Sequence, residues 1–395
     1  MYTDAGPWAR FDDLTAGTAQ LFGRPDQVAI ARRPSEVADV LDEVERRTAQ
    51  GRWAFGFVAY EAASGLDPTL TTHPPVDGLP LAWFGLTSAP RSVPVVGPGT
   101  RHEYTAGPWT AQWSAEEHRE AVGAVRARIA DGDTYQCNLT TRLTGPVSGD
   151  LTHWYRDLAL GQRGAHNAYL DTGRFVLAGA SPELFFETRG DRILMRPMKG
   201  TAPRGRTTAQ DREAVTRLRT SAKERAENIM IVDLVRNDLA RLAVPGSVEV
   251  SRLLHAERFE TVHQLTSDVT ARLRPGLGLT EMFRALFPCG SVTGAPKART
   301  MELIRDVEAG PRGVYCGAVG VVGPPDATVR ARFSVAIRTA VFDRDQGTAS
   351  YGAGGGITWG SEPAAEYAEL RAKARVLHRT TRAAAAAPGR PVSVR

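Results

Sequence analysis

The segment that decides the fold reads SPELFFETRGDRILMRPMKGT, from Ser181 to Thr201. The apolar run Leu184–Phe186, the turn signal Arg189–Asp191 and the alternating residues after it predict two strands joined by a tight turn. A hairpin folds its two ends back toward each other. Glu183 and Lys199, which stand at these ends, are therefore expected to meet at one edge of a sheet. A carboxylic acid and an amine placed in this way can act as a general acid and a nucleophile.

Lysine is a rare residue in this chain. Of the 49 basic residues, only Lys199, Lys223, Lys297 and Lys373 are lysines. Arginine is used wherever a positive charge is enough, so each lysine is a candidate for chemistry that arginine cannot perform. A desolvated lysine can lose its proton and attack, whereas a guanidinium stays charged. This favours Lys199 as a nucleophile; the alternative is that all four lysines are chance survivors on the surface.

The composition is that of an ordinary globular protein, with 395 residues, 42% of them hydrophobic and 24% charged. This length allows one large domain or two. The net charge of +5 comes from basic residues spread along the chain, without the Lys/Arg block that is typical of nucleic-acid binding. Such a charge can help to attract an anionic substrate.

The cysteines and apolar runs predict a cytoplasmic protein without a membrane partner. The three cysteines, Cys137, Cys289 and Cys316, form no C-x-x-C pair, which favours reduced thiols over disulfides or a zinc site. The first residues lack the pattern of a signal peptide. No apolar run approaches the roughly 18 residues of a membrane span.

Several elements are expected around the central hairpin: a helix over 34–44, strands over 53–60 and 81–86, a helix over 114–129, a strand over 134–141 and a helix over 221–242. Ser114 is expected to cap its helix, with Glu117 completing a capping box. Alternation in the strand after it puts Gln136 and Asn138 on one face, which is either exposed or lines a polar site. The tail after Arg379 is expected to be disordered.

Two acidic pairs have helical spacing. Glu224 and Glu227 lie three residues apart, and so do Glu366 and Glu369. If the two pairs converge, their oxygens could bind one hard cation such as Mg²⁺. From the spacing alone, the alternative is that both pairs are solvated helix faces.

Three segments have features of anion binding. The loop Gly290–Lys297 leads into a helix and is rich in small residues, although it lacks the spacing of a Walker loop. The strand after Ala331 carries two arginines, one of them Arg338, on its polar face. The glycine run before Ile357 lets backbone N–H groups approach a carboxylate, although each glycine run could equally be a turn. Together with the acidic pairs, these segments suggest a small dicarboxylate substrate.

The order of motifs resembles the chorismate-utilising enzymes, a family that includes anthranilate synthase component I, aminodeoxychorismate synthase component I and the isochorismate and salicylate synthases. The motifs that carry the resemblance are Ser181–Glu183, Pro197–Thr201, Ala226–Asp238, Gly290–Lys297, Tyr315–Gly317, Ile337–Thr339 and Gly354–Ile357. Seven motifs in the right order make a chance match improbable. The resemblance spans residues 115–378, and the segment 56–62 is also similar.

Two positions discriminate among the members of this family. Where the isochorismate and salicylate synthases have a lysine that activates water, this chain has Gln136, which cannot act as a base. Ammonia is therefore the expected nucleophile. Where anthranilate synthases have alanine, this chain has Lys199 in the pattern Pro-x-Lys-Gly-Thr, which resembles aminodeoxychorismate synthase component I.

The resemblance implies an α+β fold, a single large α/β/β/α sandwich of antiparallel sheets with flanking helices and the active site between the sheets. It divides the chain into an N-terminal part of the sandwich over 1–110, a chorismate-binding catalytic region over 111–380 and the tail over 381–395.

The resemblance also implies roles for individual residues. Lys199 would attack the ring, Glu183 would be the acid, and Glu224, Glu227, Glu366 and Glu369 would hold Mg²⁺, partly through water. The substrate-binding residues that it implies are Gln136, Thr201, Thr293, Gly294, Lys297, Tyr315, Arg338, Gly354, Gly355, Gly356 and Lys373.

The implied reaction is the Mg²⁺-dependent amination of chorismate at C4, giving 4-amino-4-deoxychorismate on the route to p-aminobenzoate for folate or a secondary metabolite. The sequence has no Gly-x-Cys-x-Gly nucleophile elbow, so a separate glutamine amidotransferase subunit is expected to supply ammonia. The alternatives are component I of anthranilate synthase or of 2-amino-2-deoxyisochorismate synthase, against which Lys199 argues, and an inactive chorismate-binding protein.

Two departures from the family pattern limit what the resemblance implies. Where tryptophan-sensitive relatives carry Asn-Pro-Ser-Pro-Tyr-Met, this chain reads His166-Asn-Ala-Tyr-Leu170, which argues against tryptophan binding. Where many members have a catalytic histidine, this chain has Gln264. His263 is one position away and is not expected to take that role.

Overall fold

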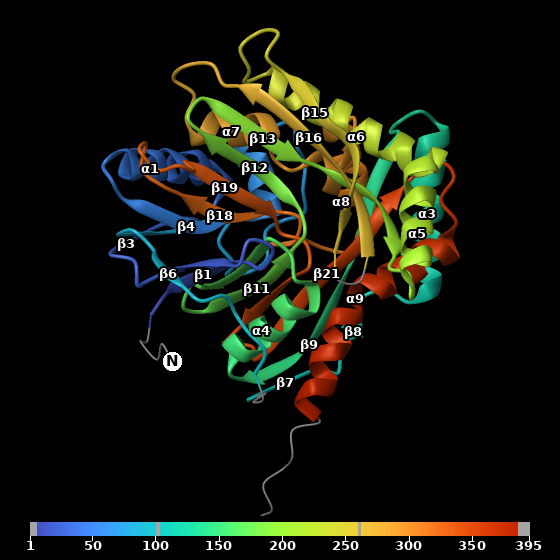
Figure 1. Cartoon of the computed structure of the whole chain (residues 1–395), viewed down its shortest axis with the longest axis horizontal. Coiled ribbons are helices and arrows are strands. Elements are labelled where there is room, and N and C mark those ends of the chain that lie inside the picture. The colour runs from blue at the N-terminus through green and yellow to red at the C-terminus, as the bar shows by residue number, and fades with distance from the viewer. Residues whose placement is uncertain (1–5, 100–102, 260–261, 386–395) are drawn as a thin grey trace, which may run out of the picture.

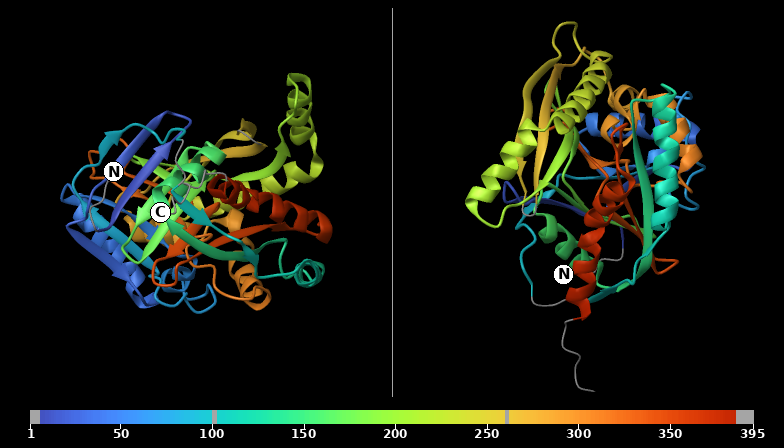
Figure 2. Two further views of the ribbon diagram at one scale, coloured as in Figure 1. Left: turned by 90° about the horizontal axis from the view of Figure 1, so that it is seen from below. Right: turned by 90° about the vertical axis from the view of Figure 1, so that its right-hand side faces the viewer.

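The computed structural model describes residues 6–99, 103–259 and 262–385, and shows two large antiparallel sheets with helices on their outer sides (Figure 1). Helices α1 (Val37–Ala49) and α6 (Ala222–Ala240) pack on one sheet, and α4 (Leu151–Gln162) and α9 (Pro363–Ala385) pack on the other. The further views in Figure 2 show the same layering. The predicted α/β/β/α sandwich is therefore confirmed.

The first sheet has eleven strands in the described residues and contains the longest strand, β9 (Gln136–Gly149). Its order is β17-β9-β21-β20-β11-β10-β1-β2-β6, with β7 and β8 paired to β9. The other strands are β1 (Trp8–Asp13), β2 (Thr18–Phe22), β6 (Arg91–Val93), β7 (Tyr104–Ala106), β8 (Thr110–Ala111), β10 (His166–Asp171), β11 (Phe175–Ser181), β17 (Gly294–Ala295), β20 (Thr339–Asp343) and β21 (Thr348–Ile357).

The second sheet has ten described strands and contains the predicted hairpin. Its order is β14-β16-β13-β12-β19-β18-β4-β5-β3, with β15 paired to β16. The strands are β3 (Gln27–Ala31), β4 (Trp53–Val58), β5 (Ala82–Thr87), β12 (Leu184–Arg189), β13 (Arg192–Arg196), β14 (Met198–Pro203), β15 (Glu249–Arg258), β16 (Val262–Arg272), β18 (Ala318–Val322) and β19 (Ala331–Val335).

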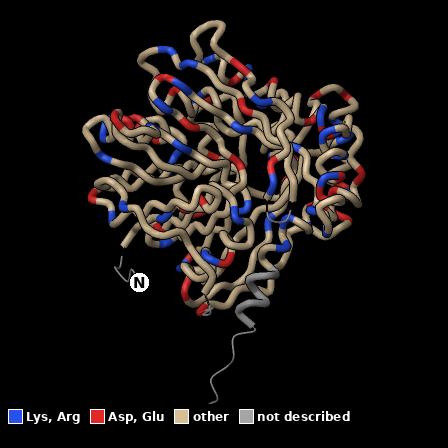
Figure 3. The backbone as a smooth tube through the Cα atoms, viewed as in Figure 1, with Lys and Arg blue, Asp and Glu red and all other residues tan. Residues whose placement is uncertain are grey.

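The remaining helices connect or cover the strands. They are α2 (Ala63–Leu66), α3 (Ala115–Ala130), α5 (Thr208–Thr220), α7 (Leu279–Leu286) and α8 (Lys297–Val307), with short 3₁₀ turns at Pro34–Glu36, Tyr60–Ala62 and Gly290–Val292. Among the described helices, none is long and apolar enough to cross a bilayer. Acidic and basic residues are interspersed along the chain (Figure 3).

Local sequence signals explain several of these elements. The apolar stripe of α1, formed by Val37, Val40, Leu41 and Val44, is buried against the second sheet. Ser114 Oγ accepts a hydrogen bond from the Glu117 N–H at 3.2 Å, and the Glu117 carboxylate accepts one from the Ser114 N–H at 2.7 Å. The predicted capping box of α3 is thus present.

The hairpin is anchored by an aromatic cluster. Phe185 and Phe186 pack with Phe283 of α7 and Phe333 of β19, and the ring-centroid distances among these four rings are 5.1–6.0 Å. All four rings are buried. Aromatic pairs at such distances stabilise a core beyond the area that they bury, so the two strands that end near Glu183 and Lys199 have a rigid base.

The structure also differs from the sequence expectations. Helix α1 begins at Val37, later than the predicted start at Pro34, because a 3₁₀ turn occupies Pro34–Glu36. Both faces of β9 are covered over residues 136–141, where Gln136 and Asn138 are buried although neither is apolar, and alternate residues are exposed from Thr144 onward. Helix α9 continues to Ala385, into the predicted tail, and residues 386–395 lie outside the described part.

Candidate active site

A cavity of about 160 Å³ lies where the two sheets and helices α6 and α9 converge. Most of the residues predicted for the site line it: Glu183, Lys199, Thr201, Glu224, Glu227, Tyr315, Arg338, Gly354, Gly356, Glu366, Glu369 and Lys373. These residues come from segments far apart in the sequence, which the sandwich brings together (Figure 1).

Glu183 is held at the entry of β12 by hydrogen bonds to its side chain and backbone. Its side chain accepts a hydrogen bond of 2.6 Å from Ser291 Oγ, and its backbone C=O accepts one from the Val335 N–H. The residue is 2% exposed. Burial raises the pKa of Glu183 to about 7, although Ser291 and Lys199 act in the opposite direction. A substantial fraction of this group is therefore a carboxylic acid near neutral pH.

Lys199 lies in β14, on the wall of the same cavity. Burial lowers the pKa of its ammonium; Glu227 and Glu183 oppose this shift, and Lys373 adds to it. A lowered pKa makes a neutral, nucleophilic amine more accessible.

The glycine run of β21 leaves room for this lysine. A Cβ atom on Gly356 would lie 2.7 Å from Lys199 Nζ and 2.9 Å from Gln136 Nε2. Strand β21 pairs with β9 along its length, but β20 stops pairing after Tyr351. The glycine segment thus has one edge not covered by β20, and there the Gly354 C=O accepts a 2.7 Å hydrogen bond from Lys373 Nζ.

The four predicted metal ligands face the cavity from two helices. Glu224 and Glu227 lie on α6, and Glu366 and Glu369 lie on α9. Burial raises the pKa of Glu227, and the negative charges of Glu224 and Glu366 raise it further, opposed by Lys199 and Lys223. For Glu369 burial favours the neutral form, but Lys373, at 2.8 Å, lowers its pKa.

This donor set fits a hard divalent cation. Four carboxylates repel one another in one cavity, and Glu227 Oε1 is buried without a hydrogen-bond partner in the described residues. Carboxylate oxygens with bridging waters are the usual ligands of Mg²⁺. No three of these four glutamates have carboxylate oxygens that all lie within 4.8 Å of one another. In the described residues, the cluster that meets this distance is elsewhere and consists of Glu103, Asp150 and His153. Binding by all four glutamates would therefore involve water or a small movement.

Some predicted residues do not reach the cavity. Lys297 Nζ forms an ion pair with Asp238 at 2.9 Å and a hydrogen bond to the Leu286 C=O. Thr293 and Gly294 pair with β9 through their backbones, on the side away from β21. These three residues therefore do not contact the cavity as expected, although Ser291 and Val292 of the same loop line it.

Gln136 and Gly355 flank the cavity without lining it. Gln136 is fully buried, and both amide atoms of its side chain lack a hydrogen-bond partner in the described residues. Its Nε2 lies beside the position of Lys199 Nζ, as the contacts of Gly356 show. A Cβ on Gly355 would contact the carboxylate of Glu366 at 3.4 Å. An unsatisfied buried amide next to a reactive amine is where a small polar molecule would be stabilised.

Several cavity residues are not among the predicted site residues: Ser291 is not singled out at all, and Lys223 and Asn138 are noted without a role at the site. Ser291 is 108 positions from Glu183, and no local pattern indicates that they meet. Gln264 also lines the cavity, and its Nε2 lies 3.4 Å from Thr201 Oγ1.

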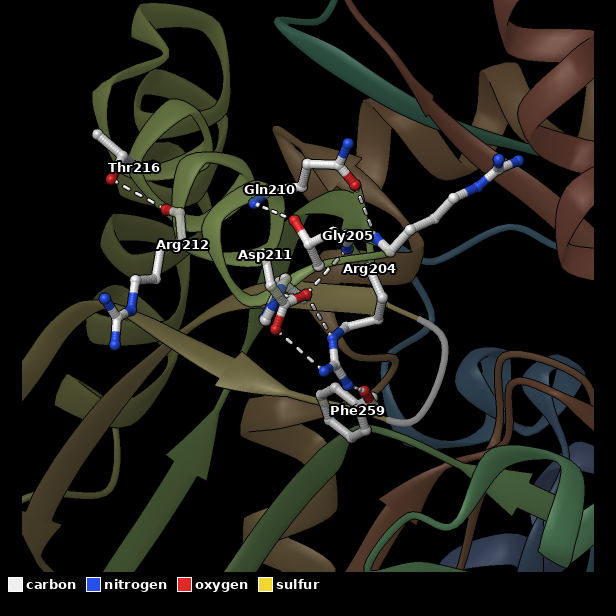
Figure 4. Close-up of polar contacts among 10 residues, drawn as sticks. Arg204, Gly205, Gln210, Asp211, Arg212, Thr216 and Phe259 are labelled. Atoms are coloured by element: carbon white, nitrogen blue, oxygen red, sulfur yellow. Dashed lines mark hydrogen bonds and ion pairs between the residues drawn. The ribbon is translucent and has the colours of Figure 1, made fainter.

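An ion-pair network fixes the strand that carries Lys199 (Figure 4). Arg204, just after β14, binds Asp211 at the start of α5 with two hydrogen bonds of 2.8 and 3.0 Å, and it also donates to the Phe259 C=O. His263 Nε2 contacts Asp211 at 2.9 Å. His263 therefore serves this network and does not line the cavity, in agreement with the sequence expectation.

A family model described as chorismate binding enzyme matches residues 97–379, which include every cavity residue. The chain belongs to this family. It is 42% identical over 274 residues to aminodeoxychorismate synthase component 1 of Klebsiella aerogenes and 41% identical over 281 residues to anthranilate synthase component 1 of Streptomyces coelicolor. These matches cover 68% and 71% of this chain but only 59% and 54% of the relatives, so the chain aligns with little more than half of their length.

Solved structures of this chorismate-binding family share the fold. Anthranilate synthase component I from Streptococcus pneumoniae superposes with a TM-score of 0.76 at 24% identity, covering 94% of this chain and 89% of that one. The menaquinone-specific isochorismate synthase of Escherichia coli gives a TM-score of 0.74 at 15% identity, covering 96% and 90%. At these identities the likeness supports the fold alone.

Proposed function

We propose that this chorismate-binding enzyme aminates chorismate at C4, giving 4-amino-4-deoxychorismate. The observation that carries the proposal is the pairing of Lys199, whose pKa is lowered, with Glu183, whose pKa is raised to about 7, in one cavity. Titratable groups with opposite shifts are the pattern of a nucleophile and an acid. The similarity to aminodeoxychorismate synthase component 1 supports the same reaction.

The substrate would be oriented through its two carboxylates. Mg²⁺ held by Glu224, Glu227, Glu366 and Glu369, in part through water, would neutralise the ring carboxylate, which would otherwise be repelled in this cavity. The second carboxylate would meet Arg338, Tyr315 and the backbone N–H groups of the glycine segment, all on the cavity wall. Lys373, already bonded to Gly354, adds positive charge there.

The reaction would then proceed in two displacements. The neutral amine of Lys199 forms a bond to C2 as both ring double bonds shift by one position and the C4–O bond breaks, and Glu183 gives its proton so that water leaves. Ammonia next forms a bond to C4, both double bonds shift back, and the C2–N bond to Lys199 breaks, so that the amine of Lys199 leaves neutral. The Glu183 carboxylate can accept the proton that the ammonium loses, which restores the starting state.

Ammonia would be held beside Lys199 by Gln136, whose unpartnered amide faces that position. The relatives named component 1 suggest a second component, and we propose a separate glutamine amidotransferase as the ammonia source. A further lyase would convert the product to p-aminobenzoate. A cytoplasmic location stays a prediction.

The rival is amination at C2, as the similarity to anthranilate synthase component 1 suggests. Lys199 favours C4, because direct amination at C2 needs no lysine nucleophile. The chain would be incubated with chorismate, MgCl₂ and an ammonium salt, and the product identified by mass and chromatography. We expect 4-amino-4-deoxychorismate; anthranilate or 2-amino-2-deoxyisochorismate would refute C4 amination, and unchanged chorismate would indicate an inactive binding protein.

A further inference from the structure

Each acidic pair of the cavity carries a lysine on its own helix. Lys223 Nζ lies 3.9 Å from Glu227 Oε1 on α6, and Lys373 Nζ lies 2.8 Å from Glu369 Oε1 on α9. The two contacts differ in strength. Lys373 is also bonded to the Gly354 C=O, whereas Lys223 lies at the cavity rim with 52% of its side chain exposed.

The choice of lysine at these positions is unusual for this chain. The other ion pairs with i,i+4 spacing within the described helices use arginine, Arg47–Glu43 and Arg217–Glu213. The same holds for Arg312–Glu308, which joins the end of α8 to the loop after it. A guanidinium can hold a carboxylate with two parallel hydrogen bonds, whereas an ammonium is a compact, strongly hydrated charge. With only four lysines among 49 basic residues, lysine beside Glu227 marks a site where the cation must be released readily.

The geometry of the contact between Lys223 and Glu227 also indicates a weak ion pair. A separation of 3.9 Å is too long for a hydrogen bond. Glu227 Oε1 has no hydrogen-bond partner in the described residues, although only 13% of the side chain is exposed. A buried carboxylate oxygen in this state is costly unless a cation is near. Lys223 supplies part of that charge from the cavity rim, and Lys199 on the cavity wall supplies more of it.

We propose that Lys223 is a displaceable counter-ion, which neutralises Glu227 while no metal is bound and is expelled when a divalent cation enters. This inference rests on the proposed function, because it assumes that the acidic cluster binds such a cation. Exchange of one ammonium for a divalent cation then raises the positive charge beside the four carboxylates by one, and metal entry must overcome the attraction between Lys223 and Glu227.

The test is a titration of the full chain with MnCl₂, because Mn²⁺ accepts the oxygen ligands of Mg²⁺ sites. The electron paramagnetic resonance signal of free Mn²⁺ measures how much of the ion is bound at each concentration. We compare wild type with Lys223→Met, Lys223→Arg and the control Arg225→Met, an exposed residue of the same helix that does not line the cavity. Lys223→Met should bind Mn²⁺ about threefold more tightly or better, since exposed ion pairs are worth up to about 1 kcal/mol. Lys223→Arg should bind it more weakly than wild type, and Arg225→Met should be unchanged.

The outcomes separate this inference from the proposed function. If wild type binds Mn²⁺ but Lys223→Met binds it equally or more weakly, Lys223 is not a competing counter-ion and the inference is overturned while metal binding stands. If wild type and both Lys223 variants bind no Mn²⁺ up to millimolar concentration, the proposed metal site itself is refuted, and the inference with it. Thermal melting of each variant confirms that the comparison is made on folded protein.

Discussion

At the scale of single residues, the cavity contains two groups, Lys199 and Glu183, whose proposed roles require opposite proton transfers. Lys199 must lose a proton to attack, and Glu183 must keep one to protonate the leaving hydroxyl. Burial serves both, because desolvation favours the neutral form of an amine and of a carboxyl alike. It lowers the pKa of Lys199 and raises the pKa of Glu183 to about 7. One physical cause thus prepares both partners.

Substitution of Lys199 tests the nucleophile directly. Lys199→Ala should retain chorismate binding but reduce C4 amination at least about a hundredfold, nearly 3 kcal/mol of transition-state stabilisation. Lys199→Arg should be equally inactive, because a guanidinium stays protonated. Calorimetry with chorismate and product analysis measure the two effects. Wild-type C4 amination by Lys199→Arg would refute the covalent role.

Glu183 gives a prediction on stability. Its pKa is near 4.5 in the unfolded chain and about 7 in the folded one, so its protonated form stabilises the fold below pH 4.5 and this stability is lost as the pH rises to 7. Glu183→Gln cannot titrate. The free energy of unfolding of Glu183→Gln minus that of wild type should therefore increase by about 3 kcal/mol between pH 4.5 and pH 8. The variant should also lose turnover.

Urea denaturation of both proteins at several pH values measures this difference. A Glu183→Gln variant whose unfolding free energy parallels that of wild type across the pH range would show that Glu183 titrates normally.

The hairpin pattern predicts this pair but not its surroundings, and those of its neighbours that are expected, such as Lys373, follow only from the family resemblance. Glu183 and Lys199 are recognisable because they end one hairpin, a local feature with its own turn signal. Ser291, which bonds Glu183, and Lys373, which acts on Lys199, come from distant segments. No periodic pattern in the sequence indicates that these distant residues contact the pair.

At the scale of elements, local chemistry determines where helices begin, and tertiary pairing determines how far strands extend. The Ser114 cap and the start of α6 after Ser221, which accepts a hydrogen bond from the Glu224 N–H, follow from the sequence. The length of β9 does not, because it depends on pairing with β21 over ten residue pairs from Thr348 to Ile357. The pairing of β14 with β16 shifts register between Met198 and Thr201, near Lys199, which no hairpin rule predicts.

The two helices with acidic pairs give the next prediction. MgCl₂ should raise the melting temperature of wild type, because an ion at about 100 times its Kd adds about 2.7 kcal/mol to the free energy of unfolding. Glu227→Gln should lose this shift and nearly all turnover. Glu213→Gln, an exposed glutamate of α5 outside the cavity, is the control and should keep both.

Differential scanning fluorimetry and product analysis provide the measurements. Full activity in excess EDTA would contradict the metal requirement.

At the scale of the whole molecule, the sandwich brings α6 and α9 to one cavity although Glu227 and Glu366 are more than a hundred residues apart. Neighbouring strands such as β12 and β19 are likewise distant in the chain. Alternation predicts strands but not which strands pair, so the layer arrangement came from resemblance to a family and not from residue patterns.

The source of ammonia is a property of the whole molecule. The purified chain should aminate chorismate with ammonium salts but not with glutamine, because the sequence has no nucleophile elbow of a glutaminase. Product formation with each nitrogen donor, at equal donor concentration, measures this. Turnover of glutamine at the rate seen with ammonium would show that the chain generates its own ammonia.

A second cavity, of about 450 Å³, lies between the two sheets and is lined by Phe11, Trp53, His166, Asn167 and Arg332 among others. It includes the segment at which tryptophan-sensitive relatives carry their Pro-Ser-Pro-Tyr-Met element, and in this chain that segment is the start of β10. Burial lowers the pKa of His166 to about 4, with Arg332 adding to the shift. The cavity wall near neutral pH is therefore a neutral imidazole beside an arginine.

We expect L-tryptophan to bind this protein only weakly, because the recognition element is absent. Calorimetric titration with tryptophan should give no saturable heat at micromolar concentration, while chorismate with MgCl₂, measured on the same sample, shows that the protein is competent to bind. A micromolar dissociation constant, about 8 kcal/mol of binding free energy, would mean that this wall recognises tryptophan by contacts other than the missing element. Repeating the titration with His166→Ala and Arg332→Ala would then locate those contacts, because loss of the heat signal in either variant assigns the ligand to the cavity between the sheets.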